Sequence, residues 1–517
     1  MTFAMPGRAQ PVAAVLAAVT ASLPAFLPRQ RWFGGKGHQV QRADVRDFAT
    51  LPDHPGTILA VVDVFADGQE MASYFLPFGL AASDTPDAPG DLVVEVGDLA
   101  VRDAIANPAT CRALLAGIAE GRTLATNQGG QFVFRPAARL GGAGPEWPAP
   151  SDLAELAVRH ANVEQSNSSV IFGDRLILKA LRRLVPGINP EIEIARFLGE
   201  HTTFDRIPAL VGWAEYVAPD GASAPVAVLQ PFVANRGDGW SYVLSQFPAN
   251  GDVPLPAEKL VHDLAALGRT LGGLHLALAT PTDDPAFAPE IIVAADVDDW
   301  RGRTQASLQT AMDQIVAGLS GPDWTDADRA LAQDVILGDG QLRAAIDGIE
   351  GLADGQTVRT RHHGDFHLGQ TLVARDGWII IDFEGEPLRS LEQRRAKQTP
   401  LRDVAGLLRS LDYARATVLR QATADASLGD AGSDGGQQTA EVDALFDRLR
   451  EAFLSAYLET VRSGSAPLLP ADQGQLHRVL LALEAEKALY ELGYEIGNRP
   501  DWVGIPLSAL VRLGRGA

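Results

Sequence analysis

The first hydrophobic pattern of the chain predicts an amphipathic helix at residues 11–27. Apolar side chains recur there at the i, i+3, i+4, i+7 spacing that places them on one helix face. These side chains are Val12, Val15, Leu16 and Val19. A cleaved signal sequence is the alternative, because the segment follows Arg8 and is rich in alanine and leucine. The helix is favoured, since the stretch is too short to span a bilayer and Pro24 interrupts it.

Strand patterns dominate the next part of the chain. Residues 57–78 contain two runs of apolar and β-branched residues around Asp67-Gly68, a dipeptide that favours a two-residue hairpin turn. Residues 165–181 repeat this arrangement around Gly173-Asp174. The first half of the chain is therefore expected to contain β-hairpins.

Helical patterns are expected on both sides of residue 232. Before it, residues 99–124 and 153–160 fit helices, and after it leucines recur every three or four residues over 260–278. Residues 422–438 are rich in Gly, Ala, Ser and Asp without an apolar period, which predicts a surface loop. The pattern as a whole indicates an α+β protein with a mostly helical C-terminal half.

The length of 517 residues allows two to four domains at about 100–200 residues each. The change from strands to helices near residue 232 predicts two lobes. We expect a small N-terminal module at residues 1–95, an N-terminal lobe at 96–232 and a C-terminal lobe at 233–517.

Composition narrows the possible partners and the cellular compartment. The formal net charge of −21 argues against nucleic acid or an anionic membrane as the main partner. The single cysteine, Cys111, excludes an intramolecular disulfide framework and a cysteine zinc cluster. These features favour a cytoplasmic protein.

The stretch His363–Pro387 is the most informative for chemistry. Asp365 is followed five residues later by Gln370, and two short predicted strands at 371–381 lead to Asp382. A tight hairpin returns its ends to each other, so Asp365 and Asp382 are expected to face one cavity. Phosphoryl transfer uses such an arrangement, because one carboxylate accepts a proton while a second carboxylate and an amide hold Mg²⁺.

A kinase also needs a positive charge on the nucleotide phosphates. Lys179 ends a predicted strand, directly after the segment Asn167-Ser168-Ser169, which could close over phosphates. Glu193, in the first turn of a predicted helix, is the candidate partner for Lys179, and Glu191 is the alternative. A Lys–Glu pair of this kind positions the ammonium against the α- and β-phosphates.

Two other functional interpretations are disfavoured. His363 and His367 are four residues apart, but a loop offers them no helical face for a transition metal, so they are expected to fix the backbone. The run Gly34–Gly37 is superficially similar to a phosphate loop, but it lacks the G-x-x-x-x-G-K-[ST] pattern of Walker-type NTPases.

Several motifs resemble known kinases. HGDFH at 363–367, DFEGE at 382–386 and LRDVA at 401–405 resemble the aminoglycoside-phosphotransferase branch of the eukaryotic-like kinase fold. Longer motifs, from about Pro28 to Leu507, resemble bacterial maltokinases, a family that also occurs fused to trehalose synthases. These motifs are PRQRWFGGKG, EQSNSSVIFGDRLILK, HHGDFHLGQTL, IIIDFEGEPLRSLEQRRAKQTPLRDVAGLLRSLDYA and EKALYELGYEIGNRPDWVGIPL.

The resemblance implies a bilobal kinase with a helical C-lobe and a defined reaction. It makes residues 1–95 an N-terminal cap subdomain and residues 96–232 an intermediate ATP-binding lobe. The implied activity is ATP- and Mg²⁺-dependent phosphorylation of maltose at its anomeric hydroxyl. The product, maltose 1-phosphate, would serve α-glucan (glycogen) and trehalose metabolism.

Site roles follow from the matching motifs. The resemblance makes Asp365 the base, assigns Mg²⁺ to Gln370 and Asp382, and assigns the nucleotide phosphates to Lys179. It places two serines in the phosphate loop, namely Ser168 and Ser169. Gln370 replaces the usual Asn of the wider kinase pattern and Glu384 the usual Gly, but both replacements occur in the maltokinase pattern. Asp403 resembles the helix acid that braces the catalytic loop in such kinases.

Aromatic and acidic residues near the C-terminus suit a disaccharide. Tyr490 and Tyr494 lie four residues apart on a predicted helix and share a face, as do Glu491 and Glu495. Aromatic rings stack on sugar C–H faces, and carboxylates accept hydrogen bonds from hydroxyls. The resemblance indicates the tyrosines as sugar contacts, and the alternative is that they pack this helix onto the C-lobe.

Two rival functions stay open. One is a kinase for another small acceptor, such as glucosamine, another sugar or an aminoglycoside. The other is a non-catalytic subunit that docks a separate trehalose synthase through the cap, although the presence of Lys179, Asp365 and Asp382 argues against it.

Overall fold

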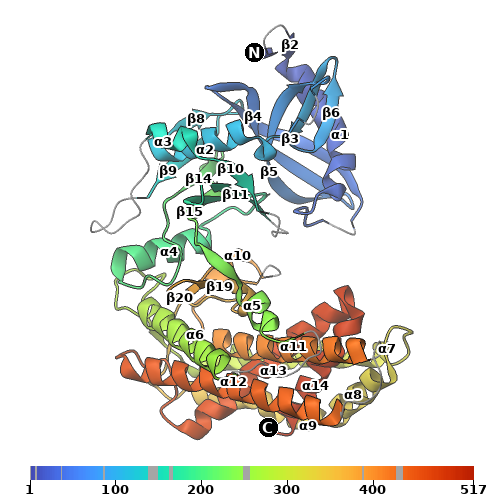
Figure 1. Cartoon of the computed structure of the whole chain (residues 1–517), viewed down its shortest axis with the longest axis vertical. Coiled ribbons are helices and arrows are strands. Elements are labelled where there is room, and N and C mark those ends of the chain that lie inside the picture. Colours follow the sequence, from blue (N-terminus) through green and yellow to red (C-terminus); the bar gives the residue numbers. More distant parts are fainter. Residues whose placement is uncertain are drawn as a thin grey trace. The chain divides into compact units, whose positions relative to one another are not determined.

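The structure is a computed structural model that divides into two compact units. The first unit comprises Met1–Glu200 and Pro208–Ala234, and the second comprises His201–Ile207 and Asn235–Ala517. Each unit is described by itself below, and their elements are labelled in Figure 1. The described residues are 2–5, 8–35, 38–85, 88–137, 150–161, 167–248, 257–386, 389–426 and 435–516.

An antiparallel sheet with the strand order β3-β4-β5-β7-β6 forms the N-terminal part of the first unit, and β13 adds to β5. Its strands are β3 (Val40–Leu51), β4 (His54–Ala66), β5 (Gln69–Ala82), β6 (Leu92–Val96), β7 (Leu99–Asp103) and β13 (Arg183–Leu184). The predicted hairpin is confirmed between β4 and β5. Both turn residues, Asp67 (φ 52°) and Gly68 (φ 80°), have the positive φ that a type I′ turn requires.

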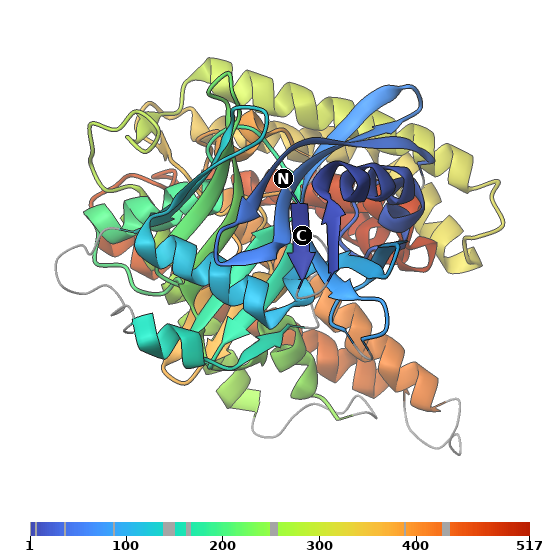
Figure 2. The same cartoon turned by 90° about the horizontal axis from the view of Figure 1, so that it is seen from above.

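Helix α1 (Val12–Phe26) confirms the first hydrophobic pattern. Its buried side chains, among them Val15 and Val19, share one core with the strands of this sheet. Figure 2 shows the dark blue helix beside the blue strands. Pro24 lies within the helix and does not end it. Among the described helices, only Val12–Arg29 has the length and hydropathy that a membrane span would need. A hairpin of β1 (Thr2–Met5) and β2 (Arg8–Pro11) precedes α1.

The helix expected at residues 99–124 is wrong over its first part. Strand β7 occupies residues 99–103 there and pairs with β5, and the turn η2 (Ala104–Ala106) follows. Helix α2 begins only at Pro108 and ends at Glu120. Asn107 caps it by accepting the Ala109 N–H at 2.9 Å, and proline follows at the first helical position. The Asn107-Pro108 start signal of α2 is visible in the sequence, but the apolar residues at 99–101 match a strand as well as a helix.

A second, seven-stranded sheet has the order β10-β11-β12-β15-β14-β9-β8. The predicted hairpin around Gly173-Asp174 is confirmed between β11 and β12. The helix expected at residues 153–160 is wrong after Glu155, because β10 pairs there with β11. The strands are β8 (Thr123–Ala125), β9 (Gln131–Pro136), β10 (Val158–His160), β11 (Asn167–Phe172), β12 (Leu176–Leu181), β14 (Gly212–Val217) and β15 (Ser223–Pro231).

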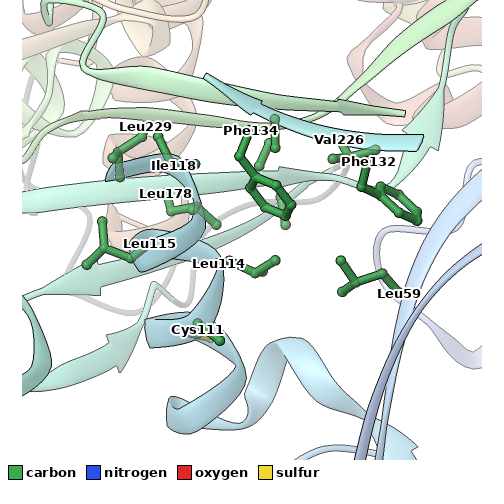
Figure 3. Close-up of a cluster of buried hydrophobic side chains, with 14 of the residues drawn as sticks. Leu59, Cys111, Leu114, Leu115, Ile118, Phe132, Phe134, Leu178, Val226 and Leu229 are labelled. Atoms are coloured by element: carbon green, nitrogen blue, oxygen red, sulfur yellow. The ribbon is translucent and has the colours of Figure 1, made fainter. Parts of the chain in front are cut away.

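Helices α2 and α4 (Pro190–His201) lie against opposite faces of this second sheet. On one face, Leu114 and Ile118 of α2 pack with Phe134 and Leu178 of the sheet (Figure 3). On the other face, Ile192 of α4 packs with sheet residues, namely Leu181 and Val228. Since side chains alternate along a strand, neighbouring residues of β11 and β12 face different environments.

The second unit is mainly helical. Its long helices are α6 (Ala257–Leu278), α7 (Ala294–Gly318), α8 (Asp326–Leu337), α9 (Asp339–Asp347), α11 (Leu401–Ala426), α12 (Gly435–Ser463), α13 (Gln473–Asn498) and α14 (Gly504–Gly514). Helix α6 confirms the leucine pattern and packs closely on α12. A Cβ at Gly268 would lie 2.2 Å from the Phe453 carbonyl oxygen, so only glycine permits this approach. The surface loop expected at 422–438 is wrong at both ends, because α11 continues to Ala426 and α12 starts at Gly435. Residues 427–434 lie outside the described residues.

A small three-stranded sheet with the order β16-β19-β20 supports the site. Strands β19 (Thr371–Ala374) and β20 (Gly377–Ile380) form the predicted hairpin, and β16 (Asn235–Asp238) pairs with β19. The short helix α5 (Gly239–Ser245) follows β16, and α10 (Leu391–Arg395) follows β20. A further strand pair joins β17 (Glu290–Ile291) to β18 (Val358–Arg359). The loop that follows β18 and carries Asp365 leads to β19.

Candidate active site

The loop between β18 and β19 is held in place by Asp403, the third residue of helix α11. Its carboxylate accepts the backbone N–H of His363 at 2.7 Å and that of Gly364 at 2.9 Å. Gly364 has a φ of 86°, a conformation that favours glycine. Asp403 therefore braces the loop that carries Asp365, as the sequence interpretation expected.

Asp403 is itself anchored by a buried histidine. His275 of α6 lies 3.0 Å from Asp403 through Nε2 and 2.9 Å from the Tyr457 hydroxyl through Nδ1. A carboxylate can only accept, so Nε2–H donates to Asp403 and the tyrosine O–H donates to Nδ1. Burial opposes ionisation of Asp403, but the charge of His362 and the hydrogen bond from His275 hold its pKa below the usual range.

The histidines of the loop fix the backbone. His363 Nε2 lies 2.8 Å from the Ile381 carbonyl oxygen, which ties the loop to the end of β20. Its Nδ1 accepts the Asp365 N–H at 3.3 Å, and His367 Nδ1 accepts the Gly369 N–H at 3.1 Å. In these contacts His363 uses both ring nitrogens and His367 uses Nδ1.

The hairpin β19–β20 brings Gln370 and Asp382 together. Gln370 Nε2 donates to Asp382 Oδ2 at 3.2 Å. Asp382 has a φ of 67°, which is uncommon outside glycine and marks a constrained backbone. A carboxylate oxygen of Glu384 lies within 4.8 Å of one of Asp382. These side chains supply amide and carboxylate oxygens, the ligand type that Mg²⁺ prefers, so the residues present fit this ion.

Asp365 and Asp382 both interact with His367, and the expectation that the two carboxylates face one cavity stays a prediction. Both carboxylates act electrostatically on this histidine and favour its charged form, but burial outweighs them and lowers the pKa of His367. The short helical turn η4 (Leu368–Gln370) connects His367 to Gln370. The loop and the hairpin thus gather three of the predicted site residues within the second unit.

Lys487 of α13 is a site residue that the sequence interpretation missed. Its Nζ lies 3.1 Å from Asp365 Oδ1 and 2.7 Å from Glu386 Oε1. Burial alone would lower the pKa of Lys487, but Asp365 and Glu386 outweigh it and raise the pKa. Burial likewise opposes ionisation of Glu386, yet Lys487 and Arg389 lower its pKa. The ion pair between Lys487 and Glu386 therefore favours the charged form of both groups.

Two cavities meet at Lys487. A cavity of about 360 Å³ is lined by four aromatic side chains: Trp240, Tyr413, Tyr490 and Tyr494. A smaller cavity of about 50 Å³ is lined by Asp365, Glu386 and Arg389. Gly406, Lys487 and Tyr490 line both cavities. Trp240 and Tyr413 were not predicted, because neither lies near the other site residues in sequence.

The four residues predicted for the sugar all lie on α13 and line the larger cavity. Tyr490 has the Lys487 ammonium 4.9 Å from its ring centre, and burial raises its pKa to about 12. Tyr494 is 42% exposed. The acids have internal partners, since Glu491 binds Arg409 at 2.7 Å and Glu495 binds Arg499 at 2.6 Å.

In the first unit, Lys179 of β12 is buried and pairs with Glu191 of α4. Lys179 Nζ lies 3.0 Å from Glu191 Oε1, which also accepts from Gln230 Nε2 at 3.2 Å. These distances identify Glu191, the alternative named from the sequence, as a partner of Lys179. Glu193 is also buried on α4, and its pairing with Lys179 stays a prediction.

The two predicted serines lie on opposite faces of the seven-stranded sheet. Ser169 stands directly across from Lys179, so these side chains share a face. Ser168 stands across from Ala180, and its hydroxyl accepts from Arg182 Nε at 2.9 Å. Residues 162–166, which connect β10 to β11, lie outside the described residues.

Arg182 connects this strand pair to the N-terminal sheet. It is 2% exposed, and its Nη2 donates to Asp103 Oδ2 at 2.7 Å. Its guanidinium carbon lies 4.9 Å from the ring centre of Trp32, and its carbonyl accepts the Phe75 N–H at 2.7 Å. Trp32 belongs to the PRQRWFGGKG motif, so part of this motif stabilises the junction of the two sheets.

Comparisons with known proteins agree with this geometry. The maltokinase N-terminal cap domain matches residues 26–106, and the phosphotransferase enzyme family matches residues 158–463, more than half of the chain. A glucosamine kinase of Streptacidiphilus jiangxiensis is 29% identical over 357 residues, 68% of this chain and 72% of that protein. One of Mycolicibacterium smegmatis is 29% identical over 362 residues, 69% of this chain and 79% of that protein.

The solved structures support the fold. A glucosamine kinase in complex with glucosamine, ADP and inorganic phosphate matches with a TM-score of 0.62 at 22% identity. The match covers 96% of this chain and 98% of the other. The expected aminoglycoside-phosphotransferase-like kinase fold with an N-terminal cap is confirmed. The chain therefore belongs to the phosphotransferase enzyme family, and it carries the N-terminal cap domain of the maltokinase family.

Proposed function

We propose that this protein is an ATP-dependent maltokinase, which phosphorylates maltose at its anomeric hydroxyl. The observation that carries the proposal is the position of Asp365 beside a cavity lined by four aromatic side chains. Asp365 lines the small cavity and its ion-pair partner Lys487 lines both. The glucosamine kinases that are similar to the chain support a sugar as the acceptor.

The reaction uses Asp365 as the base. Its carboxylate accepts the proton of the anomeric hydroxyl while the sugar oxygen attacks the γ-phosphorus. The new O–P bond forms, the bond between the γ-phosphorus and the bridging β–γ oxygen breaks, and ADP leaves with that oxygen. Asp403 and His363 keep the loop in one conformation, so little reorganisation is needed when the sugar binds.

Other residues of the two units would bind the nucleotide and neutralise the charge of its phosphates. Gln370, Asp382 and Glu384 are the residues of the second unit that would hold Mg²⁺, which neutralises charge on the nucleotide when bound. In the first unit, Lys179 would hold the α- and β-phosphates, with Glu191 as its positioning partner. Ser169 shares the face of Lys179 and is the serine placed to contact the nucleotide, whereas Ser168 acts through Arg182.

The shape of the site supports a disaccharide. The larger cavity would hold the sugar, and Lys487 and Tyr490, which line both cavities, connect it to the small cavity beside Asp365, where the anomeric hydroxyl would lie. Cavities of about 300–1,000 Å³ are typical of small-molecule sites, and the larger cavity falls in this range. Glucosamine is the second candidate acceptor, because it is named for the relatives that match most of the chain.

The biological setting follows from the proposed reaction. Maltose 1-phosphate would supply α-glucan synthesis and connect trehalose metabolism to glycogen. A trehalose synthase is the partner that the family resemblance suggests, with the cap as its docking surface. The cytoplasm is the compartment that offers ATP and these sugars.

An acceptor panel tests the proposal. The purified full-length chain is incubated with ATP, MgCl₂ and one acceptor at a time: maltose, glucose, glucosamine or an aminoglycoside. Phosphorus NMR then identifies the phosphorylated product. The expected result is an anomeric phosphate from maltose at the highest rate, whereas phosphorylation of glucosamine without any maltose product would overturn the assignment. A protein that consumes no ATP with any acceptor would instead be a non-catalytic subunit.

A further inference from the structure

The charge of the acceptor cavities is compensated by internal pairs. Seven carboxylates line them, and each has a cation or an N–H group as partner. They are Asp238, Asp365, Glu386, Asp403, Glu486, Glu491 and Glu495. Glu386 pairs with Lys487 and Arg389, and Glu491 with Arg409. Among the described residues of these cavities, an amino sugar would therefore meet carboxylates that each already have a partner, with Oε2 of Glu486 as an oxygen that makes no hydrogen bond.

Lys487 is the cation nearest to the reacting group. Its ammonium is 3.1 Å from Asp365, the proposed base, and it faces both cavities. Asp365 and Glu386 raise its pKa, so the ammonium stays charged at neutral pH. A second ammonium brought beside it would be repelled inside a poorly hydrated site, where such repulsion is stronger than in water.

We propose that Lys487 is a specificity-determining residue, which makes the site beside Asp365 accept neutral sugars and reject sugars with an ammonium group. This inference rests on the proposed function, since it assumes that the site phosphorylates a sugar. It extends that function because it names the charge class of the acceptor and the residue that sets it. Nothing in the local sequence around Lys487 indicates this role.

The alternative is a purely structural role, in which Lys487 only compensates the buried charge of Asp365 and Glu386. Removal of the lysine would then lower the activity with every acceptor by the same factor. A specificity role instead changes the ratio between neutral and charged acceptors. Glucose and glucosamine form the sharpest pair, because one carries a hydroxyl where the other carries an ammonium.

The experiment measures kcat/KM for glucose and glucosamine, and for maltose, with the full-length chain and its Lys487→Met and Lys487→Arg variants. We expect the wild type to prefer glucose over glucosamine. In Lys487→Met the glucosamine-to-glucose ratio should rise at least about tenfold, while Lys487→Arg should keep the wild-type ratio. An unchanged ratio in Lys487→Met, or a wild type that prefers glucosamine, would overturn the inference.

A matched control removes another cation from the larger cavity. Arg499 lies twelve residues further along the chain, just after α13, and its guanidinium pairs with Glu495 at 2.6 Å rather than with Asp365 or Glu386. Arg499→Met should leave the glucosamine-to-glucose ratio unchanged. Nucleotide-dependent thermal stabilisation shows that each variant is folded.

A measurement on the wild type keeps the inference testable if Lys487→Met does not fold. Glucose and glucosamine are then compared as competitive inhibitors of phosphorylation of the best neutral acceptor. Glucosamine should inhibit at least about tenfold more weakly than glucose, and equal inhibition would contradict the inference. The failure of maltose as an acceptor would overturn the proposed function alone, because the glucose–glucosamine comparison does not depend on it.

Discussion

Each unit of the molecule contains one lysine that the proposals assign to the site. Lys179 is buried and Lys487 is 19% exposed, and the two lysines are held differently. Lys179 pairs with Glu191, twelve residues away on the next helix. Lys487 lies between Asp365 and Glu386, which are 122 and 101 residues away. The first pair forms within one strand–helix unit, whereas the second exists only when α13 packs on the catalytic loop. The nucleotide side of the site is thus encoded locally, and the acceptor side depends on long-range packing.

The largest effect is expected from Asp365→Ala, which removes the proposed base and one partner of Lys487. Phosphotransfer to maltose should fall about 10³-fold or more, because general-base catalysis contributes about 10²–10⁴-fold. Lys179 and Glu191 are untouched, so ATP should still stabilise the variant against heat. Coupled ADP release and thermal shift with ATP measure the two effects, and turnover at the wild-type rate would eliminate Asp365 as the base.

Lys179→Met should instead weaken the use of ATP and leave the binding of maltose nearly unchanged. Truncation of one partner of a buried, hydrogen-bonded charge pair costs about 2–5 kcal/mol, so kcat/KM for ATP should fall about 10²-fold or more. The KM for maltose should change little, because the acceptor cavities lie in the second unit. Steady-state kinetics with ATP and maltose varied in turn measures both KM values. An equal effect on the two KM values would contradict the separation of nucleotide residues from acceptor residues.

Acid should destabilise the second unit through His362. Burial lowers the pKa of His362 to about 4, whereas the unfolded chain titrates near 6.5. The unfolded state therefore binds more protons between these values, and stability falls as the pH drops from about 6.5 to 4, by up to about 3 kcal/mol. Urea unfolding at several pH values measures this loss, and His362→Asn should flatten it. A variant with the slope of the wild type would assign the acid sensitivity to other groups.

The smallest effect on the kinetics is expected from Arg182→Met, which cuts the connection between Ser168 and the N-terminal sheet. Its loss leaves Asp103 without this buried ion-pair partner, so the stability of the variant should fall by about 3–5 kcal/mol. The hydrogen bond to Ser168 contributes only about 1 kcal/mol, so the KM for ATP should rise at most about fivefold while the KM for maltose stays constant. Arg135→Met is the matched control. Arg135 is an exposed arginine of the seven-stranded sheet, and it pairs with Glu215 at 2.7 Å. Equal KM values for ATP in both variants would make the Arg182 contacts merely structural.

Sequence reasoning succeeded where short-range rules act. The hairpins at Asp67-Gly68 and Gly173-Asp174 form as predicted, because turn residues with positive φ set their geometry locally, and the ribbon between Gln370 and Asp382 forms with Gly377 (φ 119°) directly after its turn. It failed at residues 99–103, where an apolar run fits a helix or a strand equally well. The presence of β5 as a pairing partner decided that this run is a strand.

The candidate site residues also divide into those that local sequence patterns indicated and those that only the tertiary structure revealed. Asp365, Gln370 and Asp382 could be predicted because they stand close together in one motif, and Lys179 because it ends a strand before a capped helix. Lys487, Trp240 and Arg182 could not, because their partners come from distant elements. The contact of Glu191 with Lys179 also required the structure, since both Glu191 and Glu193 occupy the first turn of α4, and the pairing of Glu193 stays a prediction.

The sequence by itself determined the β-hairpins and helices α1 and α6, the HGDFH and DFEGE motifs and the family of this kinase, because turns and hydrophobic periods act within a few residues. Only the tertiary structure decided which charges meet around Asp365 and which aromatic side chains enclose the acceptor cavity. The physical reason is that buried ion pairs and cavity walls join residues a hundred or more positions apart. Their distance in space follows from helix packing, which no local pattern records.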